Sequence, residues 1–248
     1  MNEIKIEPLE WDTNYFKARC GKVVIKDEEA TFFHFEEMKK DYEFISIQNI
    51  DNNIRMNKKI AENTNAYLVD INVQFEKKLP KNGEQTQSKE HYRVVAANEI
   101  SEEILSEMRV EEDDFAFSKF VCDPELKKRN GYLVYKEWLK NACTEKDKYF
   151  IIHFAEGKVG AYMLFNIDDA IGKVEIVKVN RENQGQHIAT EMMNEVENFL
   201  VSRNTKKFIV GTQLNNIPAM NLYHSLGFKE TSRTSVFHLW VKKEQLFK

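Results

Sequence analysis

The sequence of 248 residues has little of what marks secreted, membrane-spanning or nucleic-acid-binding proteins. Its three cysteines, Cys20, Cys122 and Cys143, form no C-x-x-C pair, which argues against a disulfide framework or a zinc site and fits a reducing cytoplasm. No segment approaches the ~18 apolar residues of a membrane helix, and the N-terminus MNEIKIEPLEWD lacks the apolar stretch of a signal peptide. A net charge of −4 without a sustained basic run argues against nucleic acid as a partner.

Prolines are few, at four, and neither internal repeats nor low-complexity tracts occur. A hydrophobic content of 42% is enough to build one or two globular cores. The segment 76–90, EKKLPKNGEQTQSKE, is polar, carries Pro and Gly and lacks apolar periodicity, which predicts a linker. We therefore expect a small N-terminal α/β domain over residues 1–80 and a larger domain over residues 90–248.

The first region contains short segments rich in β-branched and aromatic residues, which predict strands at 22–25 and 44–47. A helix is expected at 51–62, and the alternating stretch AYLVDINVQF predicts a strand at 66–75. Together these elements indicate a small α/β unit.

The second region alternates strands with helices. Glu156-Gly157 predicts a tight hairpin turn. The expected strands are 92–96, 149–154, 159–165, 174–179, 208–212 and 235–241, and the expected helices are 101–108, 132–142, 186–203 and 218–225. The helix at 186–203 has the clearest pattern, because Ile188, Met192 and Val196 recur at helical spacing. The acidic run 111–114 is expected to be a solvated loop.

The stretch 174–189, VEIVKVNRENQGQHIA, runs from a predicted strand through a polar loop into this long helix. The first N–H groups of a helix lack internal partners and lie at the positive end of the helix dipole, where a pyrophosphate binds well. Gly185 lets the backbone approach phosphate oxygens closely, and Ala189 is small beside the expected ligand. The stretch is neither a Walker loop nor a dinucleotide fingerprint, and an ordinary strand–loop–helix connection explains it equally well.

Two motifs that follow one another along the chain favour the phosphate-binding interpretation over the ordinary connection. QGQHIA resembles the [QR]-x-x-G-x-[GA] loop of the GNAT acetyltransferases, and NIPAMNLYHSLGF resembles their second signature, N-x-x-A-x-x-L-Y-x-x-x-G-F. The matching positions of the second motif are Asn216, Ala219, Leu222, Tyr223, Gly227 and Phe228. His187 departs from the pattern, since the family usually has a glycine there, and a positive φ would be costly for histidine. The resemblance implies a GNAT fold, with a mixed central sheet flanked by helices, that uses acetyl-CoA and no metal.

The resemblance also implies which residues contact acetyl-CoA: Val177, Lys178, Val179, Gln184, Gly185, Gln186, His187, Ile188, Ala189 and Asn216. Two parallel strands would splay here, so that strand backbone pairs with the pantetheine arm and the N–H of Val177 or Val179 faces the thioester oxygen. Asn216 either hydrogen-bonds the pantetheine amide or only caps the helix that follows.

The implied chemistry is attack of an amine on a thioester. Tyr223 matches the tyrosine that the family uses as the acid for the leaving thiolate, although packing beside Leu222 would also explain it. The base is left open between Asp70, Glu175 and water.

A looser resemblance, to the dTDP-fucosamine acetyltransferases, covers IEPLEWDTNYF, AYLVDINVQF, AFSKFVCDPEL with YKEWLKNA, and GTQLNNIPAMNLY. It implies a small-molecule amine acceptor of the amino-sugar nucleotide class and a homodimer. Phe120 and Asp123 would then line the acceptor pocket, although aromatic packing and helix capping before Pro124 explain them as well. The alternatives are a GNAT enzyme acting on another small amine and a non-catalytic acyl-CoA-binding module.

Overall fold

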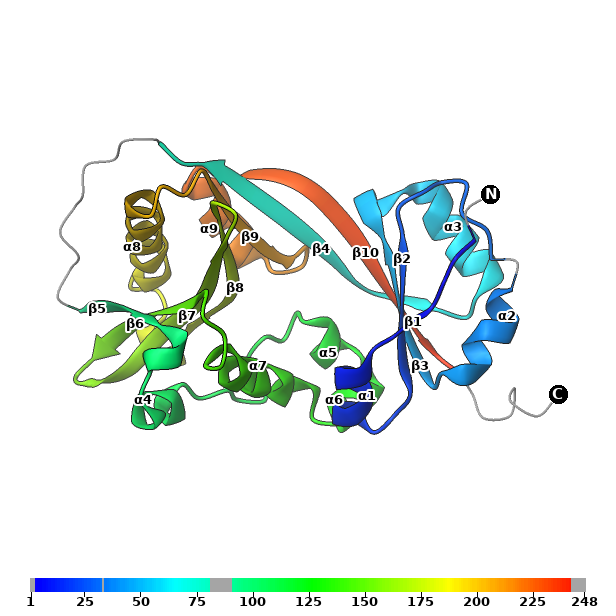
Figure 1. The fold of residues 1–248 in the computed structure, drawn as a ribbon, viewed down its shortest axis with the longest axis horizontal. Coiled ribbons are helices and arrows are strands. Elements are labelled where there is room, and N and C mark those ends of the chain that lie inside the picture. The colour runs from blue at the N-terminus through cyan, green and yellow to red at the C-terminus, as the bar shows by residue number, and fades with distance from the viewer. Residues whose placement is uncertain (1–2, 33, 81–90, 242–248) are drawn as a thin grey trace.

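The computed structural model describes residues 3–32, 34–80 and 91–241. Within these residues, ten strands form one mixed sheet in the order β1-β2-β3-β10-β4-β9-β8-β7-β6-β5 (Figure 1). The strands are β1 (Glu7–Pro8), β2 (Cys20–Ile25), β3 (Phe44–Asn49), β4 (Tyr67–Lys78), β5 (Tyr92–Ala96), β6 (Lys148–Ala155), β7 (Lys158–Asp168), β8 (Ile171–Val179), β9 (Lys207–Gln213) and β10 (Lys229–Trp240). The α-helices are α1 (Glu10–Phe16), α2 (Phe35–Met38), α3 (Ile54–Asn63), α4 (Glu102–Glu107), α5 (Lys119–Cys122), α6 (Pro124–Lys128), α7 (Val134–Ala142), α8 (Ile188–Ser202) and α9 (Ile217–Ser225). The predicted mixed sheet with flanking helices is confirmed.

Helices cover both faces of the sheet around the parallel pair β8 and β9. On one face, Met192, Val196 and Leu200 of α8 are fully buried in a core that also contains side chains of α9. On the other face, Leu139 and Ala142 of α7 are buried against β6 and β7. Each buried Met, Val or Leu side chain contributes roughly 1.5–3 kcal/mol, so both helix layers are held firmly on the strands that they cover.

Two long strands, β4 and β10, connect the N-terminal region with the rest of the molecule (Figure 1). The C-terminal half of β10 pairs with β3, β10 also pairs with β4, and β4 pairs with β9. Phe237, Leu239 and Val241 complete the core formed with β2, β3 and α3. The region 1–80 therefore shares both its sheet and its core with the end of the chain. The predicted linker 76–90 begins inside β4, and residues 81–90 lie outside the described part.

Several element boundaries differ from those predicted. The helix expected at 51–62 begins at Ile54, because Asp51 has a positive φ of 61° and Asn53 caps the helix, accepting from Met56 N at 3.0 Å. The last strand begins at Lys229 rather than at 235, because its polar first half pairs with β4. Among the described residues, α1, α2, α5 and α6 were not predicted by residue range, since they are too short to show a helical apolar pattern.

Candidate active site

The parallel strands β8 and β9 pair over only four positions, from Ile171↔Lys207 to Val174↔Val210, and then separate. Glu175 forms a bulge at the point of separation, because Phe165 of β7 lies opposite Val174 while Leu164 lies opposite Ile176. A bulge bends its strand and increases the local twist. The splayed strands expected from the GNAT resemblance are therefore present at the expected place.

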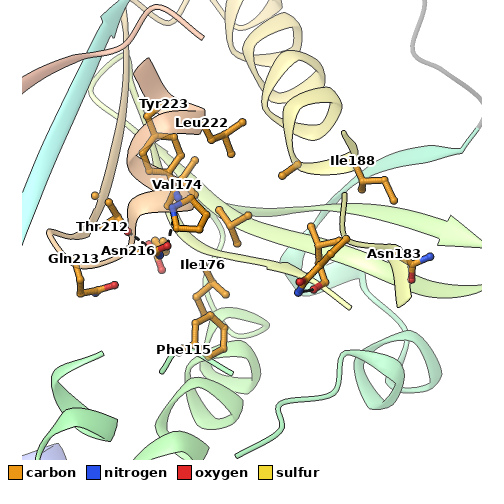
Figure 2. A pocket seen from close by; sticks show the side chains of 18 of the residues that line it. Phe115, Val174, Ile176, Asn183, Ile188, Thr212, Gln213, Asn216, Leu222 and Tyr223 are labelled. Atoms are coloured by element: carbon orange, nitrogen blue, oxygen red, sulfur yellow. Dashed lines mark hydrogen bonds between the residues drawn. The ribbon is translucent and has the colours of Figure 1, made fainter. Parts of the chain in front are cut away.

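The gap between the strands opens into a cavity of about 680 Å³, here called the main cavity (Figure 2). Its walls come from β8, from the end of β9, from the loop and first turn of α8, and from α9. Of the residues expected to contact acetyl-CoA, the following line it: Val177, Val179, Gln184, Gly185, His187, Ile188, Ala189 and Asn216. Tyr223 and Glu175 line it as well.

Helix α8 begins at Ile188, two residues later than predicted, because both Gly185 and His187 adopt positive φ angles of 77° and 60°. His187 therefore takes the left-handed conformation that the family pattern usually assigns to glycine, and its side chain makes no capping hydrogen bond. The first N–H groups of α8 thus remain available beside the main cavity, at the positive end of a helix of 15 residues. This geometry suits an anionic ligand.

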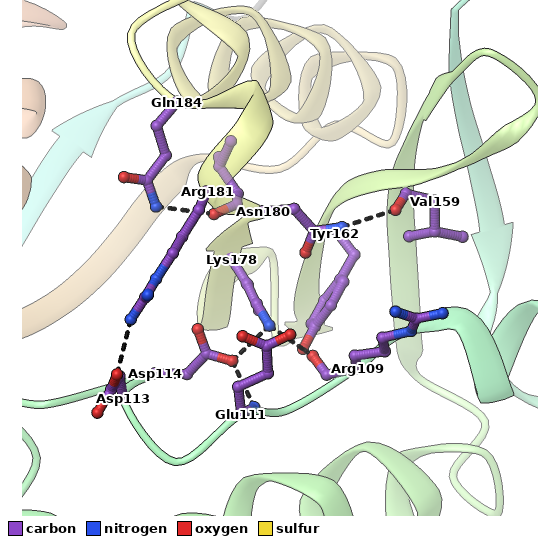
Figure 3. A network of polar contacts seen from close by, with 11 residues as sticks. Arg109, Glu111, Asp113, Asp114, Val159, Tyr162, Lys178, Asn180, Arg181 and Gln184 are labelled. Carbon is purple, nitrogen blue, oxygen red and sulfur yellow. Dashed lines mark hydrogen bonds and ion pairs between the residues drawn. The ribbon is translucent and has the colours of Figure 1, made fainter.

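Two predicted contact residues lie outside the main cavity. The Lys178 side chain points to the opposite face of β8, where its ammonium donates to Arg109 O at 2.7 Å and to the carboxylate of Asp114 (Figure 3). The Gln186 amide donates to Glu182 O at 3.1 Å. Any contact from Lys178 to a ligand in this cavity would therefore come from its backbone.

The N–H groups of Val177 and Val179 point away from β7. Asn180 N donates to Gly160 O of β7 at 2.9 Å, and successive N–H groups of a strand point to alternate sides. The N–H of Val179, and of Val177 two residues before it, therefore point to the side from which β9 has departed. The backbone donors expected from the resemblance face the gap.

The acidic run 111–114 is not simply a solvated loop, as expected from its composition. Asp114 binds the buried Lys178, Arg181 donates to Asp113 at 2.8 Å, and Tyr162 Oη donates to Arg109 O at 3.1 Å (Figure 3). These contacts fix the loop against β7 and β8. The loop thereby places Phe115, which sequence reasoning did not identify, against the main cavity.

Asn216 and Tyr223 lie at the two ends of α9 and both line the main cavity (Figure 2). Asn216 caps the helix, since its Oδ1 accepts from Ala219 N at 3.3 Å, and its Nδ2 donates to Thr212 Oγ1 at 3.1 Å. Tyr223 is 4% exposed, and its ring contacts Phe75 with a centroid distance of 5.4 Å. Burial raises the pKa of the Tyr223 phenol, which is therefore protonated at neutral pH.

A second cavity of about 410 Å³ adjoins the main one, because Tyr135, Val174, Glu175, Gly211 and Gln213 line both. Here called the second cavity, it lies between the sheet and the helices α5 and α7, and residues of β3, β4 and β10 form part of its wall.

Asp70 of β4 lines the second cavity. Burial raises the pKa of its carboxyl to about 6, although the nearby positive charge of Lys119 acts in the opposite direction. Asp70 is thus an ionised carboxylate at neutral pH with an affinity for protons well above that of an ordinary aspartate.

Glu175, the other carboxylate considered as a base, has a different environment from that of Asp70. Its Oε2 accepts from Trp138 Nε1 at 2.8 Å and from Lys148 Nζ at 2.9 Å. These contacts occupy the carboxylate of Glu175, whereas Asp70 has no cation in contact with it among the described residues. The geometry therefore favours Asp70 over Glu175 as a base.

The two residues expected in the acceptor pocket are separated by the structure. Phe120 lines the second cavity. Asp123 does not line it and is fully buried, and it caps α6 by accepting from the N–H groups of Glu125 and Leu126 at 2.8 and 3.0 Å. Its carboxylate also accepts from Tyr67 Oη at 2.8 Å and Trp240 Nε1 at 3.0 Å, and it bonds His238 Nδ1 at 2.7 Å. The capping role that the sequence left open is the one observed.

Some residues that line the main cavity were not predicted from the sequence. Thr212 and Gln213 complete the main cavity from the end of β9, and a polar pair after an apolar strand was the available signal. Tyr135 and Trp138 of α7, which were not singled out in the sequence as site residues, line the second cavity.

Residues 108–228, which contain β8, α8, β9 and α9, match the family model described as the Acetyltransferase (GNAT) family. Both motifs singled out in the sequence fall in this range. The fold and the splayed strands are those of the GNAT class, and the match to the GNAT family model extends over residues 108–228.

Among curated proteins, the chain is similar to the spore coat polysaccharide biosynthesis protein SpsD of Bacillus subtilis (strain 168). The two are 25% identical over 134 residues, which cover 53% of this chain and 46% of SpsD. The chain therefore spans about half the length of this relative.

Among solved structures, a functionally unknown conserved protein from Staphylococcus epidermidis ATCC 12228 superposes with a TM-score of 0.66 at 13% identity, over 98% of this chain and 92% of that chain. A GCN5-related N-acetyltransferase from Sphaerobacter thermophilus gives a TM-score of 0.54 at 13% identity, over 79% of this chain and 59% of that chain. Both similarities concern the fold alone.

Across the described ranges, no helix has the length and apolar character needed to cross a bilayer. Nor does that part of the chain hold three or more His, Cys, Asp or Glu side chains grouped to bind a metal ion.

Proposed function

We propose that this protein transfers an acetyl group from acetyl-CoA to a primary amine. One observation carries the proposal: the gap between β8 and β9, the free N–H end of α8 and the Tyr223 side chain all meet in the main cavity. A pyrophosphate on the α8 end and a pantetheine arm along β8 would direct the acyl group to the junction with the second cavity.

The main cavity fits acetyl-CoA by the chemistry of its walls. Gly185, His187, Ile188 and Ala189 would hold the pyrophosphate with backbone N–H groups. The N–H groups of Val177 and Val179 would pair with the pantetheine arm, and Asn216 would add its amide. Acetyl-CoA supplies a thioester whose carbonyl carbon is open to attack by an amine and whose thiolate leaves.

Two proton transfers accompany the reaction, and a different residue carries out each one on its own side of the thioester. On the acceptor side, Asp70 takes a proton from the attacking amine, directly or through a water molecule. On the cofactor side, Tyr223 gives its phenolic proton to the leaving thiolate, and its raised pKa keeps that proton in place until then. An N–H of Val177 or Val179 donates to the carbonyl oxygen as negative charge develops there.

The acceptor that we propose is an amino sugar linked to a nucleotide. Three observations support this class. The sequence resembles the dTDP-fucosamine acetyltransferases in four separate stretches. The similar protein SpsD is described as acting in polysaccharide biosynthesis. The second cavity has polar walls, contributed in part by the region 1–80, so that this region would serve acceptor binding and residues 90–248 acetyl-CoA binding.

The test is release of CoA thiol from acetyl-CoA with a panel of acceptors: a dTDP-linked 4-amino sugar, a polyamine, an amino acid and an aminoglycoside. We expect turnover with the sugar nucleotide at the highest kcat/KM. Turnover with the polyamine and none with the sugar nucleotide would reject the acceptor class. CoA binding without thiol release for any amine would reject catalysis and leave an acyl-CoA-binding module.

A further inference from the structure

The second cavity contains a lysine, Lys119, whose ammonium has no hydrogen-bond or ion-pair partner among the described residues. Its Nζ lies 5.1 Å from the centroid of the Phe120 ring. Other shielded lysines of the protein differ in this respect. Lys39 pairs with Glu36 at 2.6 Å, Lys148 pairs with Glu175 at 2.9 Å, and Lys178 pairs with Asp114.

A shielded ammonium without a partner costs free energy that a bound anion would recover. Burial lowers the pKa of Lys119, and the positive charge of Lys22 acts in the same direction. The carboxylates of Asp12 and Asp70 act against this shift from a distance. Because neither carboxylate is in contact with Nζ, the ammonium retains its capacity to bind an anion that enters the second cavity.

The surroundings of Lys119 suit a hydroxylated ring. Gln48, Asn72, Gln213 and Thr234 present amides and a hydroxyl from four different strands, and such groups both donate and accept hydrogen bonds. Phe120, Tyr135 and Trp138 cover this polar floor from the helix side. Two lysines line this cavity, of which Lys173 is exposed and Lys119 is shielded. Two carboxylates line it as well, and Glu175 is already paired with Lys148 at 2.9 Å. Lys119 is therefore the shielded position for a negative charge, and Asp70 is the carboxylate that is free to face an amine.

We infer that Lys119 is the anion-binding residue of the acceptor site, and that it pairs with the phosphate attached to the sugar while the amine at the other end of the ring faces Asp70. The inference rests on the proposed function, because it assigns a role within its acceptor site. It makes Lys119 a specificity residue that selects phosphate-linked amino sugars over free ones.

The kinetic test compares a nucleoside-diphosphate 4-amino sugar with the same amino sugar lacking the nucleotide. A charge-assisted hydrogen bond of ~1.5–3 kcal/mol corresponds to roughly 10- to 100-fold in affinity. We expect Lys119→Gln to raise KM for the nucleotide-linked acceptor by that factor and to leave KM for the free amino sugar and for acetyl-CoA unchanged. Lys119→Arg should restore most of the loss, and Lys136→Gln, at an exposed lysine of α7 that lines neither cavity, should change nothing.

Equal KM increases for both acceptors, or a larger effect on an amine that carries a carboxylate, would overturn the assignment to phosphate. A second measurement does not depend on the acceptor. With the protein saturated with CoA, inorganic pyrophosphate should raise the melting temperature of the wild type and not that of Lys119→Gln.

Equal shifts in the two proteins, or no shift in the wild type, would contradict the inference. A pyrophosphate shift that depends on Lys119, in a protein that acetylates no amino-sugar nucleotide, would instead reject the proposed acceptor and retain the anion site.

Discussion

At the scale of single residues, Asp70 combines position and proton affinity. It lines the second cavity beside the shared wall of the main one, and burial raises the pKa of its carboxyl to about 6. A base with a pKa near the working pH removes a proton effectively while remaining ionised. Glu175 lies nearer to the strand gap, but Trp138 and Lys148 hold its carboxylate.

We predict that Asp70→Asn lowers kcat/KM for the acceptor by roughly 10²- to 10⁴-fold, because the substitution removes the proton acceptor. In the wild type, kcat/KM should rise with pH through about 6, as Asp70 ionises, and the variant should lack this step. Steady-state kinetics between pH 5 and 8 measure both effects. Asp147→Asn, at an exposed aspartate, is the matched control, and an unchanged step in Asp70→Asn would remove Asp70 as the base.

The same substitution should stabilise the protein. The native pKa of Asp70 lies above the ordinary value of 3.8, so the native state holds the proton more tightly and ionisation destabilises it. Asp70→Asn should therefore raise the free energy of unfolding at pH 7 by on the order of 1–3 kcal/mol. The gain should vanish as pH falls from about 6 towards 4. Urea unfolding at several pH values measures it, and a gain that persists at pH 4 would contradict the assigned cause.

For Tyr223, we predict that Tyr223→Phe lowers kcat by about 10²-fold or more with acetyl-CoA binding nearly intact, because only the proton donor is removed. The ring packing against Phe75 is preserved by phenylalanine. Tyr149→Phe, at a tyrosine that lines neither cavity, controls for loss of a hydroxyl. Unchanged kcat in Tyr223→Phe would leave Tyr223 with a packing role only.

Among single residues, those that belong to a sequence motif could be predicted as members of the candidate site. The motifs predicted Tyr223, Asn216 and the loop glycine, which all line the main cavity, because the order and spacing of a motif can be read directly from the chain. Lys119 was not predicted, since its distinguishing property is the lack of a partner, and that depends on which side chains the fold brings near. The bulge at Glu175 depends on register between strands and leaves no mark in the sequence.

At the scale of elements, the start of α8 is the decisive feature. Gly185 and His187 both have positive φ angles, and these two residues and the first turn of α8 line the main cavity. The sequence predicted the helix but placed its start at residue 186, because a helical pattern does not show which of two loop residues leaves the helical conformation. Helix α3 differs from α8, because the side chain of Asn53 caps α3 and fixes where it starts.

We predict that Gly185→Ala weakens acetyl-CoA binding by about tenfold or more, because a Cβ at φ 77° strains the loop whose N–H groups we propose to bind the pyrophosphate. Gly157→Ala is a matched control, since Gly157 has φ 79° in the β6–β7 hairpin and an added Cβ meets nothing within 4 Å at either site. Both variants should lose about 1–2 kcal/mol of stability, and only Gly185→Ala should lose affinity by calorimetry. Equal affinities in the two variants would show that the loop does not bind the ligand.

At the scale of the whole molecule, a single sheet joins the region 1–80 to the rest through β4 and β10. The strand pattern of each region was predicted, but the pairing of β10 with β3 was not, because no local pattern encodes a contact between residues so far apart in sequence. Asp123 reinforces the connection, since it caps α6 and holds Tyr67 of β4 with His238 and Trp240 of β10.

We predict that Asp123→Ala lowers the free energy of unfolding at pH 7 by about 3–5 kcal/mol, because it leaves buried donors without their acceptor. Burial acts to raise the pKa of the Asp123 carboxyl, but its hydrogen bonds together hold that pKa below the ordinary value. The contribution of Asp123 to stability is therefore present above pH ~4 and is lost as pH falls below that value. Denaturant unfolding followed by tryptophan fluorescence and circular dichroism should give one coincident transition. Asp147→Ala should change stability by less than about 0.5 kcal/mol, and separate transitions for the two probes would contradict a shared sheet.

The central claim is that CoA lies between β8 and β9 with its diphosphate on the α8 end. A structure of the protein crystallised with CoA tests it most directly. The account predicts pyrophosphate oxygens against the N–H groups of residues 185–189, the pantetheine arm along Val177 and Val179, and the thiol beside Tyr223. CoA bound elsewhere, with the gap between the strands filled by side chains, would contradict it.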